Sequence, residues 1–275
     1  MEKRFTLTGK VYLAGGGPGS AKLLTLRALE ILRAADVVLH DDLVSDEVLA
    51  MVPPHVAVLN VGKRCGSKKA TQEEIHRRMI AAARNGQAVV RLKGGDPLIF
   101  ARTRDEIEAL REAGIDFEII PGITAATAAA AVAQIPLTDR KNASKLVLVT
   151  NHRVPEKDAR GWHTNLTADA TLVFYMPGSD FAMLSAELVE SGLREDTPCL
   201  LVSQATRPGQ KVNRTTIRDL VRTPALAAPS LLIVGAAAAE ARADEVFVSG
   251  GASNPVDEYE EISLDLSQPD EMTAG

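Results

Sequence analysis

The stretch of this sequence best suited to hold a ligand is a strand that ends in two glycines and an aspartate. Residues 87–92 read as a buried strand, and Gly94, Gly95 and Asp96 come just after it. Because glycine has no Cβ, a pair of glycines lets the main chain come into contact with a ligand. The carboxyl ends of strands are also where open α/β sheets bind their ligands. The same residues are equally consistent with an ordinary strand–helix turn capped by an aspartate.

A second glycine-rich turn, near the start of the chain, raises the question of nucleotide binding. The dinucleotide fingerprint G-x-G-x-x-G has its first two glycines here as Gly15 and Gly17, but Ser20 stands at the third position. Asp41 and Asp42 follow at the distance expected of a carboxylate that binds a ribose. A nicotinamide-dependent oxidoreductase or a non-catalytic nucleotide-binding module therefore remains open.

The composition excludes several classes of protein. With 275 residues and a net charge of −5, the chain can form one large or two medium domains and has no global positive field to attract nucleic acid. Its two cysteines, Cys65 and Cys199, lie far apart, and no H-E-x-x-H motif or His–Cys cluster suggests a metal site. The longest apolar runs are too short to cross a bilayer. We expect a soluble, cytoplasmic protein without a metal, a membrane or a nucleic-acid partner.

The first half of the chain alternates short apolar runs with helical patterns, which is typical of βαβ units and a mainly parallel sheet. A capping box at Thr71, for example, predicts the start of a helix that ends near Gly86. The expected strands span residues 10–14, 36–39, 56–61, 87–92 and 117–120, and the expected helices lie at 24–35, 71–86 and 100–113. We assign residues 9–122 to an N-terminal α/β lobe.

The second half of the chain begins with an alanine-rich helical pattern, and its expected strands and helices do not alternate as regularly as in the first half. The expected strands are 145–150, 171–175, 198–203 and 230–234, with helices at 124–133, 180–191 and 215–222 and a hairpin at 204–213. We assign residues 123–249 to a C-terminal α/β lobe. Residues 250–275 carry many acidic side chains and neither Lys nor Arg, so we expect an acidic, disordered tail.

Seven short motifs, taken together, go further than either glycine turn. They occur in order, nearly without gaps, between Gly9 and Gly235, at residues 15–19, 41–45, 61–64, 94–97, 121–126, 135–138 and 174–176. In this combination the sequence resembles the tetrapyrrole (precorrin) methyltransferases. Within that family it is most similar to the enzymes that act on uroporphyrinogen III.

The resemblance implies an α/β protein with a two-lobed, tetrapyrrole methyltransferase-like fold. A mainly parallel N-terminal sheet and a mixed-sheet C-terminal lobe would flank a cleft that holds the active site. The implied reaction is methylation of uroporphyrinogen III at carbons two and seven by S-adenosylmethionine, which gives precorrin-2 for sirohaem or cobalamin-type cofactors and releases S-adenosylhomocysteine. The family also implies a homodimer.

The resemblance also implies which residues bind the methyl donor. By motif position they are Pro18, Gly94, Gly95, Asp96, Ile99, Thr124, Ala125, Met176 and Ala205. These residue types suit a sulfonium, a cation without hydrogen-bond donors that is best held by carbonyl oxygens and apolar walls. Gly94 and Gly95 would bring the main chain close, Thr124 and Ala125 would offer main-chain groups at a helix start, and Met176 would give a polarizable contact.

The substrate site implied by the resemblance consists of Arg102, Asp105, Arg140 and Met176. The two arginines suit this substrate, because the tetrapyrrole carries carboxylates around its rim and arginine binds a carboxylate through its planar guanidinium. Asp41 is the implied proton acceptor and Lys63 the implied proton donor. Arg102 would also act in catalysis by holding the macrocycle against the methyl group.

Several residues depart from the family pattern, and they cluster on the side expected to bind the tetrapyrrole. His40 replaces a tyrosine, Asp42 replaces a frequent arginine, and residues 103–105 replace a Gly-Gly-Glu sequence. The turns expected to hold the methyl donor are nearly intact. A sister methyltransferase that acts on a later precorrin or another acceptor is therefore an alternative. A relative that methylates RNA is disfavoured by the acidic charge and the few aromatic residues.

Overall fold

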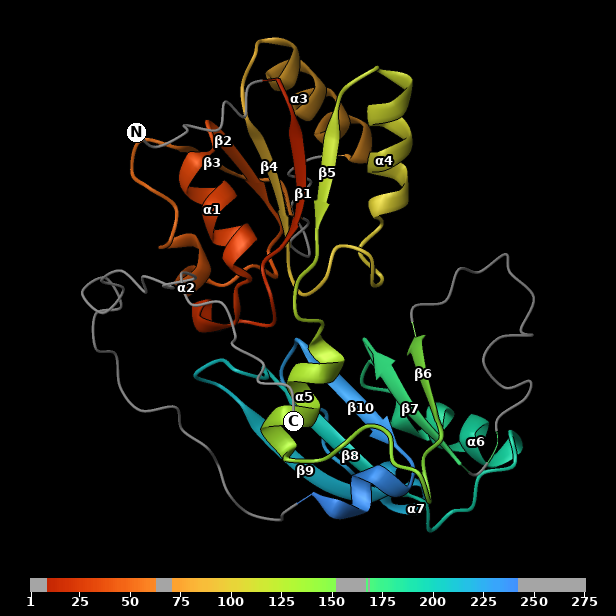
Figure 1. The fold of residues 1–275 in the computed structure, drawn as a ribbon. Helices are drawn as coiled ribbons and strands as arrows, with labels where there is room; N and C mark the ends of the chain where they lie inside the picture. The colour runs from red at the N-terminus through yellow and green to blue at the C-terminus, as the bar shows by residue number, and fades with distance from the viewer. Residues whose placement is uncertain (1–8, 63–70, 152–166, 168, 242–275) are drawn as a thin grey trace, which may run out of the picture.

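Two five-stranded sheets, each covered by helices, make up the part of the chain that the computed structural model describes, residues 9–62, 71–151, 167 and 169–241 (Figure 1). The first sheet is parallel and the second is mixed, which confirms the predicted α/β fold class. We call the first sheet with its helices the N-terminal lobe and the second sheet with its helices the C-terminal lobe. Among the described residues, no helix combines the length and the apolar character that a membrane span requires.

The N-terminal sheet has the strand order β3-β2-β4-β1-β5, with all neighbours parallel. Its strands are β1 (Val11–Gly15), β2 (Val37–His40), β3 (Ala57–Asn60), β4 (Val89–Lys93) and β5 (Phe117–Ile120). Its helices are η1 (Ala21–Leu23), α1 (Leu26–Ala34), α2 (Asp46–Leu49), α3 (Gln72–Arg84) and α4 (Thr103–Glu112). The predicted cap of α3 is confirmed, because the Thr71 hydroxyl accepts a hydrogen bond from the main-chain N–H of Glu74 at 3.2 Å.

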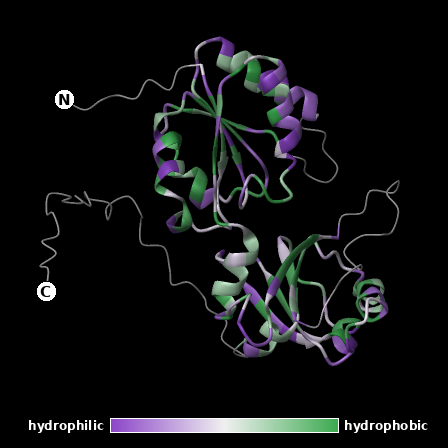
Figure 2. Cartoon of the chain, turned by 45° about the vertical axis from the view of Figure 1, so that its right-hand side comes forward, coloured by the Kyte–Doolittle hydropathy of each residue, from purple (hydrophilic) through white to green (hydrophobic). Residues whose placement is uncertain are grey.

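Helices on both faces bury the central strands β1, β2 and β4, which explains why these strands are largely apolar, whereas the edge strand β3 is mostly exposed. Successive residues of β1 point to opposite faces. Tyr12 and Ala14 pack with α1 and α2, while Val11 and Leu13 pack with α3 and α4. Figure 2 shows the apolar strands at the centre of this lobe and the polar outer sides of its helices.

The carboxyl ends of all five parallel strands lie at one edge of the N-terminal sheet, and this edge faces the C-terminal lobe (Figure 1). Both glycine turns of the sequence, after β1 and after β4, are therefore at the same edge. The chain crosses to the C-terminal lobe between Ile120, the last residue of β5, and Ala125, the first residue of α5. We call the region where the two lobes meet the lobe junction.

The C-terminal sheet has the order β6-β7-β10-β8-β9, in which only β6 and β7 pair in parallel. Its strands are β6 (Lys145–Thr150), β7 (Ala170–Tyr175), β8 (Pro198–Ser203), β9 (Lys211–Thr216) and β10 (Ser230–Val234). Helix α5 (Ala125–Ala133) and η2 (Ala236–Glu240) cover one face. Helices α6 (Phe181–Glu190) and α7 (Ile217–Leu220) cover the other.

The short helices η1, α2 and η2 were not predicted, and several other bounds shift by one or two residues. Three further differences have a reason in the structure. Helix α4 begins at Thr103 and not near Phe100, because Phe100 and Arg102 adopt left-handed backbone angles with φ of 53° and 54°. The hairpin is formed by β8 and β9, so residues 204–210 are its loop and not one of its strands. Helix α7 is shorter than predicted because Thr215 and Thr216 pair with β8.

Candidate functional site

Three glycines meet where strands β1, β4 and β5 end. Gly15 closes β1, and Gly95 and Gly122 follow β4 and β5. A Cβ added at Gly15 would lie 2.6 Å from the Cα of Gly122 and 2.7 Å from the carbonyl oxygen of Gly95. A Cβ at Gly122 would overlap with the same carbonyl and lie 2.8 Å from the Cα of Gly15. Main chains this close leave no room for a side chain at either position.

Gly94 and Gly95 have different reasons to be glycine. Gly95 has a φ of 71° and exchanges two main-chain hydrogen bonds with Gly17, at 3.2 and 2.7 Å. On its Cβ side the nearest atom is the main-chain nitrogen of Ala125, at 3.9 Å, so this face is open toward the start of α5. A Cβ at Gly94 would instead lie 2.7 Å from the Cβ of Leu43. The structure therefore leaves space beside Gly95, whereas Gly94 makes room for the chain's own Leu43.

The carboxylate of Asp96 holds the turn after β4. One oxygen, Oδ1, accepts a hydrogen bond from the N–H of Leu98 at 2.7 Å, and the other accepts one from the N–H of Gly122 at 3.0 Å. The N–H of Ile99 donates to the main-chain oxygen of Asp96 at 3.3 Å. Asp96 thus ties the turn that contains Gly95 to the crossing between the lobes.

Replacing Gly122 with alanine is expected to weaken binding of S-adenosylhomocysteine together with stability. The new methyl group would push apart the ends of β1 and β4, at a cost of about 1–3 kcal/mol in the free energy of unfolding. Chemical denaturation and calorimetric titration of the variant would measure both effects. Gly86→Ala is the matched control, because Gly86 has a φ of 79° with nothing within 4 Å of an added Cβ. It should lose stability through backbone strain alone and keep its affinity.

The start of α5 is joined to the end of β7 by a tyrosine. The Tyr175 hydroxyl lies 2.6 Å from the hydroxyl oxygen of Thr124 and accepts a hydrogen bond from the N–H of Ala126 at 3.1 Å. Burial raises the pKa of Tyr175, although its two hydrogen bonds act in the opposite direction. The ring of Phe100, from the N-terminal lobe, packs against the ring of Tyr175 with 5.0 Å between centroids. Met176 follows with its side chain exposed.

A second contact between the lobes comes from the loop after β8. The Arg207 guanidinium donates through Nε to the main-chain oxygen of Pro18 at 3.0 Å. The hydroxyl of Thr206 accepts a hydrogen bond from the N–H of Ser20 at 3.2 Å. Ala205, two residues before Arg207, is thereby brought beside the turn that follows β1. Desolvation lowers the pKa of Arg207, which is consistent with its partly buried place between the lobes.

Left-handed residues other than glycine gather around the lobe junction. Five of the six in the described part of the chain are Phe100, Arg102, Met176, Gln204 and Thr206, with φ between 49° and 65°; the sixth, Gln134, caps the C-terminal end of α5. Such conformations cost about 1–3 kcal/mol each and are concentrated at binding and catalytic sites. Together with the open face of Gly95, they mark the lobe junction as the candidate site.

The nine residues predicted to bind the methyl donor all lie on segments that reach this junction. They lie on the loops after β1, β4, β5, β7 and β8, and they are Pro18, Gly94, Gly95, Asp96, Ile99, Thr124, Ala125, Met176 and Ala205. What these loops offer a ligand is main chain, one exposed thioether and the N-terminus of a nine-residue helix. The helix N-terminus and the main-chain amides suit the anionic end of a ligand, and the thioether suits an apolar body.

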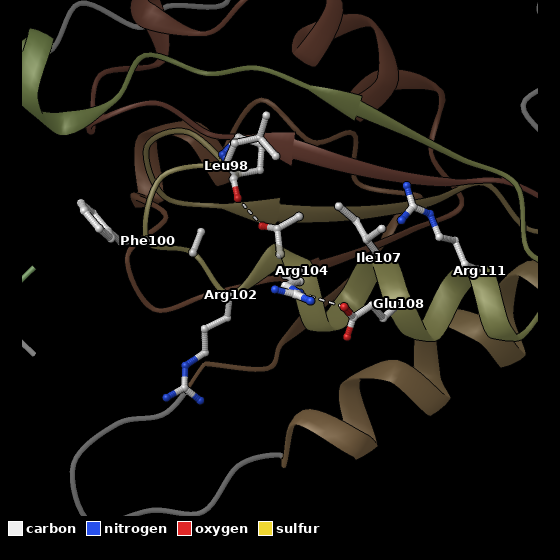
Figure 3. Close-up of a pocket in the computed structure, with 10 residues that line it drawn as sticks. Leu98, Phe100, Arg102, Arg104, Ile107, Glu108 and Arg111 are labelled. Carbon is white, nitrogen blue, oxygen red and sulfur yellow. Dashed lines mark hydrogen bonds and ion pairs between the residues drawn. The ribbon is translucent and has the colours of Figure 1, made fainter. Parts of the chain in front are cut away.

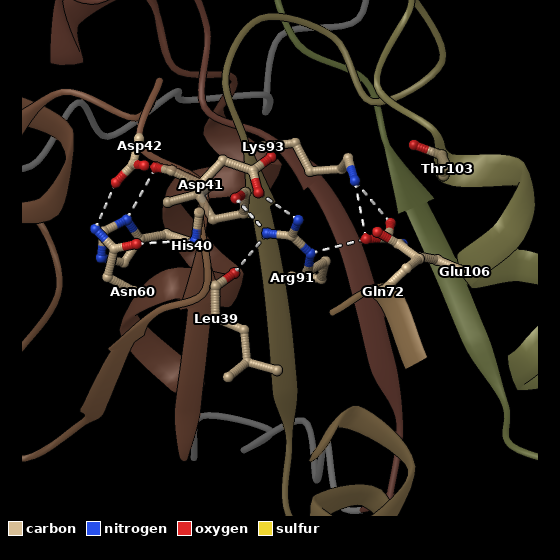
Figure 4. A network of polar contacts seen from close by, with 12 residues as sticks. Leu39, His40, Asp41, Asp42, Asn60, Gln72, Arg91, Lys93, Thr103 and Glu106 are labelled. Carbon is tan, nitrogen blue, oxygen red and sulfur yellow. Dashed lines mark hydrogen bonds and ion pairs between the residues drawn. The ribbon is translucent and has the colours of Figure 1, made fainter. Parts of the chain in front are cut away.

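Asp41 stands at the end of β2 and is bonded to a network of buried charges (Figure 4). Its Oδ1 accepts a hydrogen bond from the guanidinium of Arg91. Arg91 also donates to Glu106 at 2.9 Å, and Lys93 donates to both oxygens of Glu106 at 2.9 and 2.8 Å. The side chain of Asp41 is 29% exposed, whereas that of Glu106 is fully buried. One carboxylate of the network therefore reaches the surface at the carboxyl edge.

The residues predicted to bind the tetrapyrrole are less tightly grouped. Arg102 and Asp105 are exposed at the start of α4, where Arg102, Arg104 and Arg111 border an open depression of about 540 Å³ (Figure 3). Arg104 is paired with Glu108 at 2.8 Å, whereas the guanidinium of Arg102 has no hydrogen bond or ion pair with any described residue. In Figure 3 its guanidinium extends away from the other two arginines.

Two predicted residues are not placed with the others. Arg140 lies in the turn that leads into β6, and the register pairs Lys145 with Ala170 and Thr150 with Tyr175. The turn is therefore at the end of the strand pair opposite to Tyr175, and the described residues provide no contact between Arg140 and Arg102. Lys63 is outside the described residues.

Sequence reasoning missed three contributors to the site. Tyr175 and Arg207 connect the lobes, and the pair Arg91–Glu106 fixes Asp41. A signal was present for the last, since two basic residues interrupt an otherwise apolar strand and must find partners if that strand is buried. No such signal marks Arg207. Within the described part of the chain, no group of His, Cys, Asp and Glu side chains has an arrangement suited to a metal ion.

Comparison with known proteins gives this geometry a family. The sequence matches the family described as Tetrapyrrole (Corrin/Porphyrin) Methylases over residues 10–221. It is 45% identical over 240 residues to the uroporphyrinogen-III C-methyltransferase of Paracoccus denitrificans, which covers 85% of this chain and 83% of that protein. It is 43% identical over 236 residues to siroheme synthase 1 of Klebsiella pneumoniae. That match covers 86% of this chain and 50% of the relative, so the chain spans about half the length of the siroheme synthases it matches.

A solved structure shows the same arrangement of lobes. The uroporphyrin-III C-methyltransferase of Thermus thermophilus, crystallised with S-adenosylhomocysteine, superposes with a TM-score of 0.71 at 33% identity. The superposition covers 83% of this chain and 98% of that one. The family match, which spans both lobes and the junction between them, and this shared fold lead to one conclusion. The chain belongs to the family of tetrapyrrole (corrin/porphyrin) methylases.

Proposed function

We propose that the chain is a methyltransferase that uses S-adenosylmethionine to methylate uroporphyrinogen III at carbons two and seven, giving precorrin-2. The observation that carries this proposal is the 45% identity to a uroporphyrinogen-III C-methyltransferase of which 83% is covered. That match covers 85% of this chain. S-adenosylmethionine is the methyl donor, and S-adenosylhomocysteine leaves as a product.

The residues of the lobe junction fit the methyl donor. Gly95 leaves its Cβ side open beside the nitrogen of Ala125, where the amide of Ala125 at the N-terminus of α5 can meet a carboxylate, while the amide of Ala126 is bonded to Tyr175. Met176, with its side chain 52% exposed, provides a polarizable wall for the sulfonium. Both side-chain oxygens of Asp96 already accept main-chain amides, so Asp96 serves the site by shaping the turn.

The macrocycle would be held by Arg102, Asp105, Met176 and Arg140, and Asp41 would accept a proton or a hydrogen bond from it, with Lys63 as donor. Arg102 is the strongest of these assignments, because its guanidinium is exposed and has no partner among the described residues. Arg140 is the weakest, since it lies at the far end of β6 from Tyr175. Methyl transfer is an in-line displacement, so the main contribution of these residues is to orient the reacting carbon.

Incubation with uroporphyrinogen III and labelled S-adenosylmethionine tests the reaction. The expected product carries two methyl groups and has the absorbance of the oxidised precorrin-2 chromophore. No labelled product from uroporphyrinogen III, combined with methylation of a later precorrin, would assign the chain to a sister activity.

Calorimetric titration with S-adenosylhomocysteine and with NAD separates the methyltransferase from a nicotinamide-dependent oxidoreductase. The turn at Gly15 and Gly17 is followed by η1 and by a main helix that starts only at Leu26. It therefore lacks the immediate helix N-terminus on which a dinucleotide-binding turn places the pyrophosphate. We expect binding of S-adenosylhomocysteine and none of NAD; the reverse result contradicts the proposal.

A homodimer and a cytoplasmic location also belong to this proposal, as expectations taken from the family. Sedimentation equilibrium would report the mass in solution. A monomer at every concentration would contradict the first of these expectations.

A further inference from the structure

A guanidinium buried in the N-terminal lobe, that of Arg91, donates a hydrogen bond to the carboxylate of Asp41. The side chain of Arg91, the middle residue of β4, is 3% exposed and reaches Asp41 just after the end of β2. It donates through Nε to Glu106 at 2.9 Å and through one terminal nitrogen to the carbonyl oxygens of Leu39 and Leu92, both at 3.3 Å. Its other terminal nitrogen donates to Oδ1 of Asp41. The guanidinium is thus fixed in three directions before it meets Asp41.

The charges of this network balance, which is why it can be buried. Arg91 and Lys93 are the cations, and Asp41 and Glu106 are the anions (Figure 4). Burial opposes the charged form of Arg91, but the two carboxylates outweigh it and raise its pKa. Burial and then repulsion by Arg91 lower the pKa of Lys93, in spite of its pairing with Glu106. Glu106 anchors both cations, so the position of Arg91 does not depend on Asp41 alone.

The main chain around Asp41 is fixed as well. Its N–H donates to the carbonyl oxygen of Leu92 at 3.3 Å, and its own carbonyl accepts from the N–H of Val44 at 3.1 Å. The ring nitrogen Nδ1 of His40 lies 3.0 Å from the same carbonyl. The neighbouring carboxylate, Asp42, is bonded through Oδ1 to the amide of Asn60 at 2.9 Å and not to Arg91. The only charged group of a described residue that contacts the Asp41 carboxylate is therefore Arg91.

We propose that Arg91 is a positioning residue of the methylation reaction, which acts by holding the Asp41 carboxylate in one orientation, aimed at the macrocycle. The inference rests on the proposed function and deepens it, because it states what orients Asp41 for its proposed role as acceptor toward the macrocycle. Arginine is suited to this task and lysine is not, since only the planar fork can bond Glu106, two carbonyls and Asp41 in fixed directions. A partly exposed carboxylate without such support would sample several rotamers.

A kinetic double-mutant cycle on Arg91→Lys and Asp41→Asn tests the proposal. Turnover of uroporphyrinogen III would be measured at saturating S-adenosylmethionine. Lysine keeps a positive charge near Glu106 but loses the fork. We expect Arg91→Lys to lower kcat about tenfold, since displacing a reacting group by about 1 Å can cost as much as 100-fold. In the Asp41→Asn background the same change should lower kcat less than about twofold, because two residues that act as a unit are not additive.

Two further measurements distinguish positioning from a general structural effect. The Kd for S-adenosylhomocysteine should stay within about twofold of the wild-type value in Arg91→Lys, because Arg91 acts through Asp41 and not through the donor site. Lys93→Gln is the matched control: it lies on the same strand and has the same partner, Glu106, but does not contact Asp41. Its effect on kcat should be the same factor with Asp41 or with Asn at position 41.

An equal loss of kcat from Arg91→Lys in both backgrounds would overturn the inference, and so would a parallel loss of S-adenosylhomocysteine binding. Should Arg91→Lys not fold, Asp41→Glu replaces it, because one added methylene moves the carboxylate off the fixed guanidinium; full activity of that variant would also overturn the inference. A wild-type chain that binds S-adenosylhomocysteine but does not methylate uroporphyrinogen III contradicts the proposed function instead. An Asp41→Asn variant with full activity contradicts the role of Asp41 itself, and this inference with it.

Discussion

Glu106→Gln is expected to lower the free energy of unfolding by about 3–5 kcal/mol, the usual cost of removing one partner from a buried ion pair. Glu106 is fully buried and accepts hydrogen bonds from both Arg91 and Lys93, at 2.8 to 2.9 Å. Glutamine has the same shape, so the variant leaves two buried cations facing one partly exposed carboxylate, Asp41, without opening a cavity. Two positive charges left in a low-dielectric interior must be neutralised, hydrated or exposed, and each of these destabilises the native state.

Chemical denaturation at neutral pH would measure this loss, and a neighbouring residue offers the control. Glu108 lies on the same helix and pairs with Arg104 at 2.8 Å, but both side chains are more than half exposed. Glu108→Gln should therefore change the stability by less than about 1 kcal/mol. A similar loss in the free energy of unfolding for the two variants would show that the buried network contributes no more to stability than a surface ion pair.

Arg102→Ala is expected to lower the rate of methyl transfer at least tenfold while leaving binding of S-adenosylhomocysteine intact, since one lost charge-assisted contact is worth about 1.5–3 kcal/mol. Arg102 is exposed beside the lobe junction and holds a left-handed conformation with φ of 54°. None of the described residues bonds to its guanidinium, so its planar fork is available to a carboxylate of the macrocycle. The loss should therefore fall on kcat and on the KM for the tetrapyrrole.

Steady-state kinetics with each substrate varied in turn, together with calorimetric titration, would check this expectation. Arg104→Ala is the matched control, because Arg104 is exposed two residues away and is already paired with Glu108. It should retain nearly normal turnover. Near-normal turnover in Arg102→Ala, or the same loss in both variants, would remove Arg102 from the site.

Local pattern was enough to predict most of the secondary structure. The bounds of β5, β6, β8 and β10 were predicted to the residue, and the capping box at Thr71 marked the start of α3. Apolar runs, caps and turn residues act within a few positions of one another, so the residues next to each position in the sequence are enough to predict its secondary structure. The family resemblance, resting on seven motifs in order, led from there to the fold class.

What local pattern could not predict are the features that depend on contacts between distant segments. Helix α4 starts three residues late because Phe100 turns to pack against Tyr175, which lies 75 positions further along the chain. Arg207 and Pro18, which bond across the lobe junction, are 189 residues apart. The separation of Arg140 from Arg102 likewise follows from the direction of β6 and not from any residue near either arginine. The domain bounds at residue 249 and the acidic tail fall outside the described residues and stay predictions.

The sequence by itself determined the α/β class and the glycine turns at the carboxyl ends of the strands, because hydrophobic periodicity and turn residues are local properties. The order of its seven motifs added the resemblance to the tetrapyrrole methylase family. Only the tertiary structure decided what each of these residues does. It showed that Gly94 makes room for Leu43 while Gly95 opens toward α5, and that Arg91 and Glu106 stand behind Asp41. Burial and pairing of charge exist only once strands and helices pack, so the partners of a carboxylate such as Asp41 cannot be predicted from its neighbours in sequence.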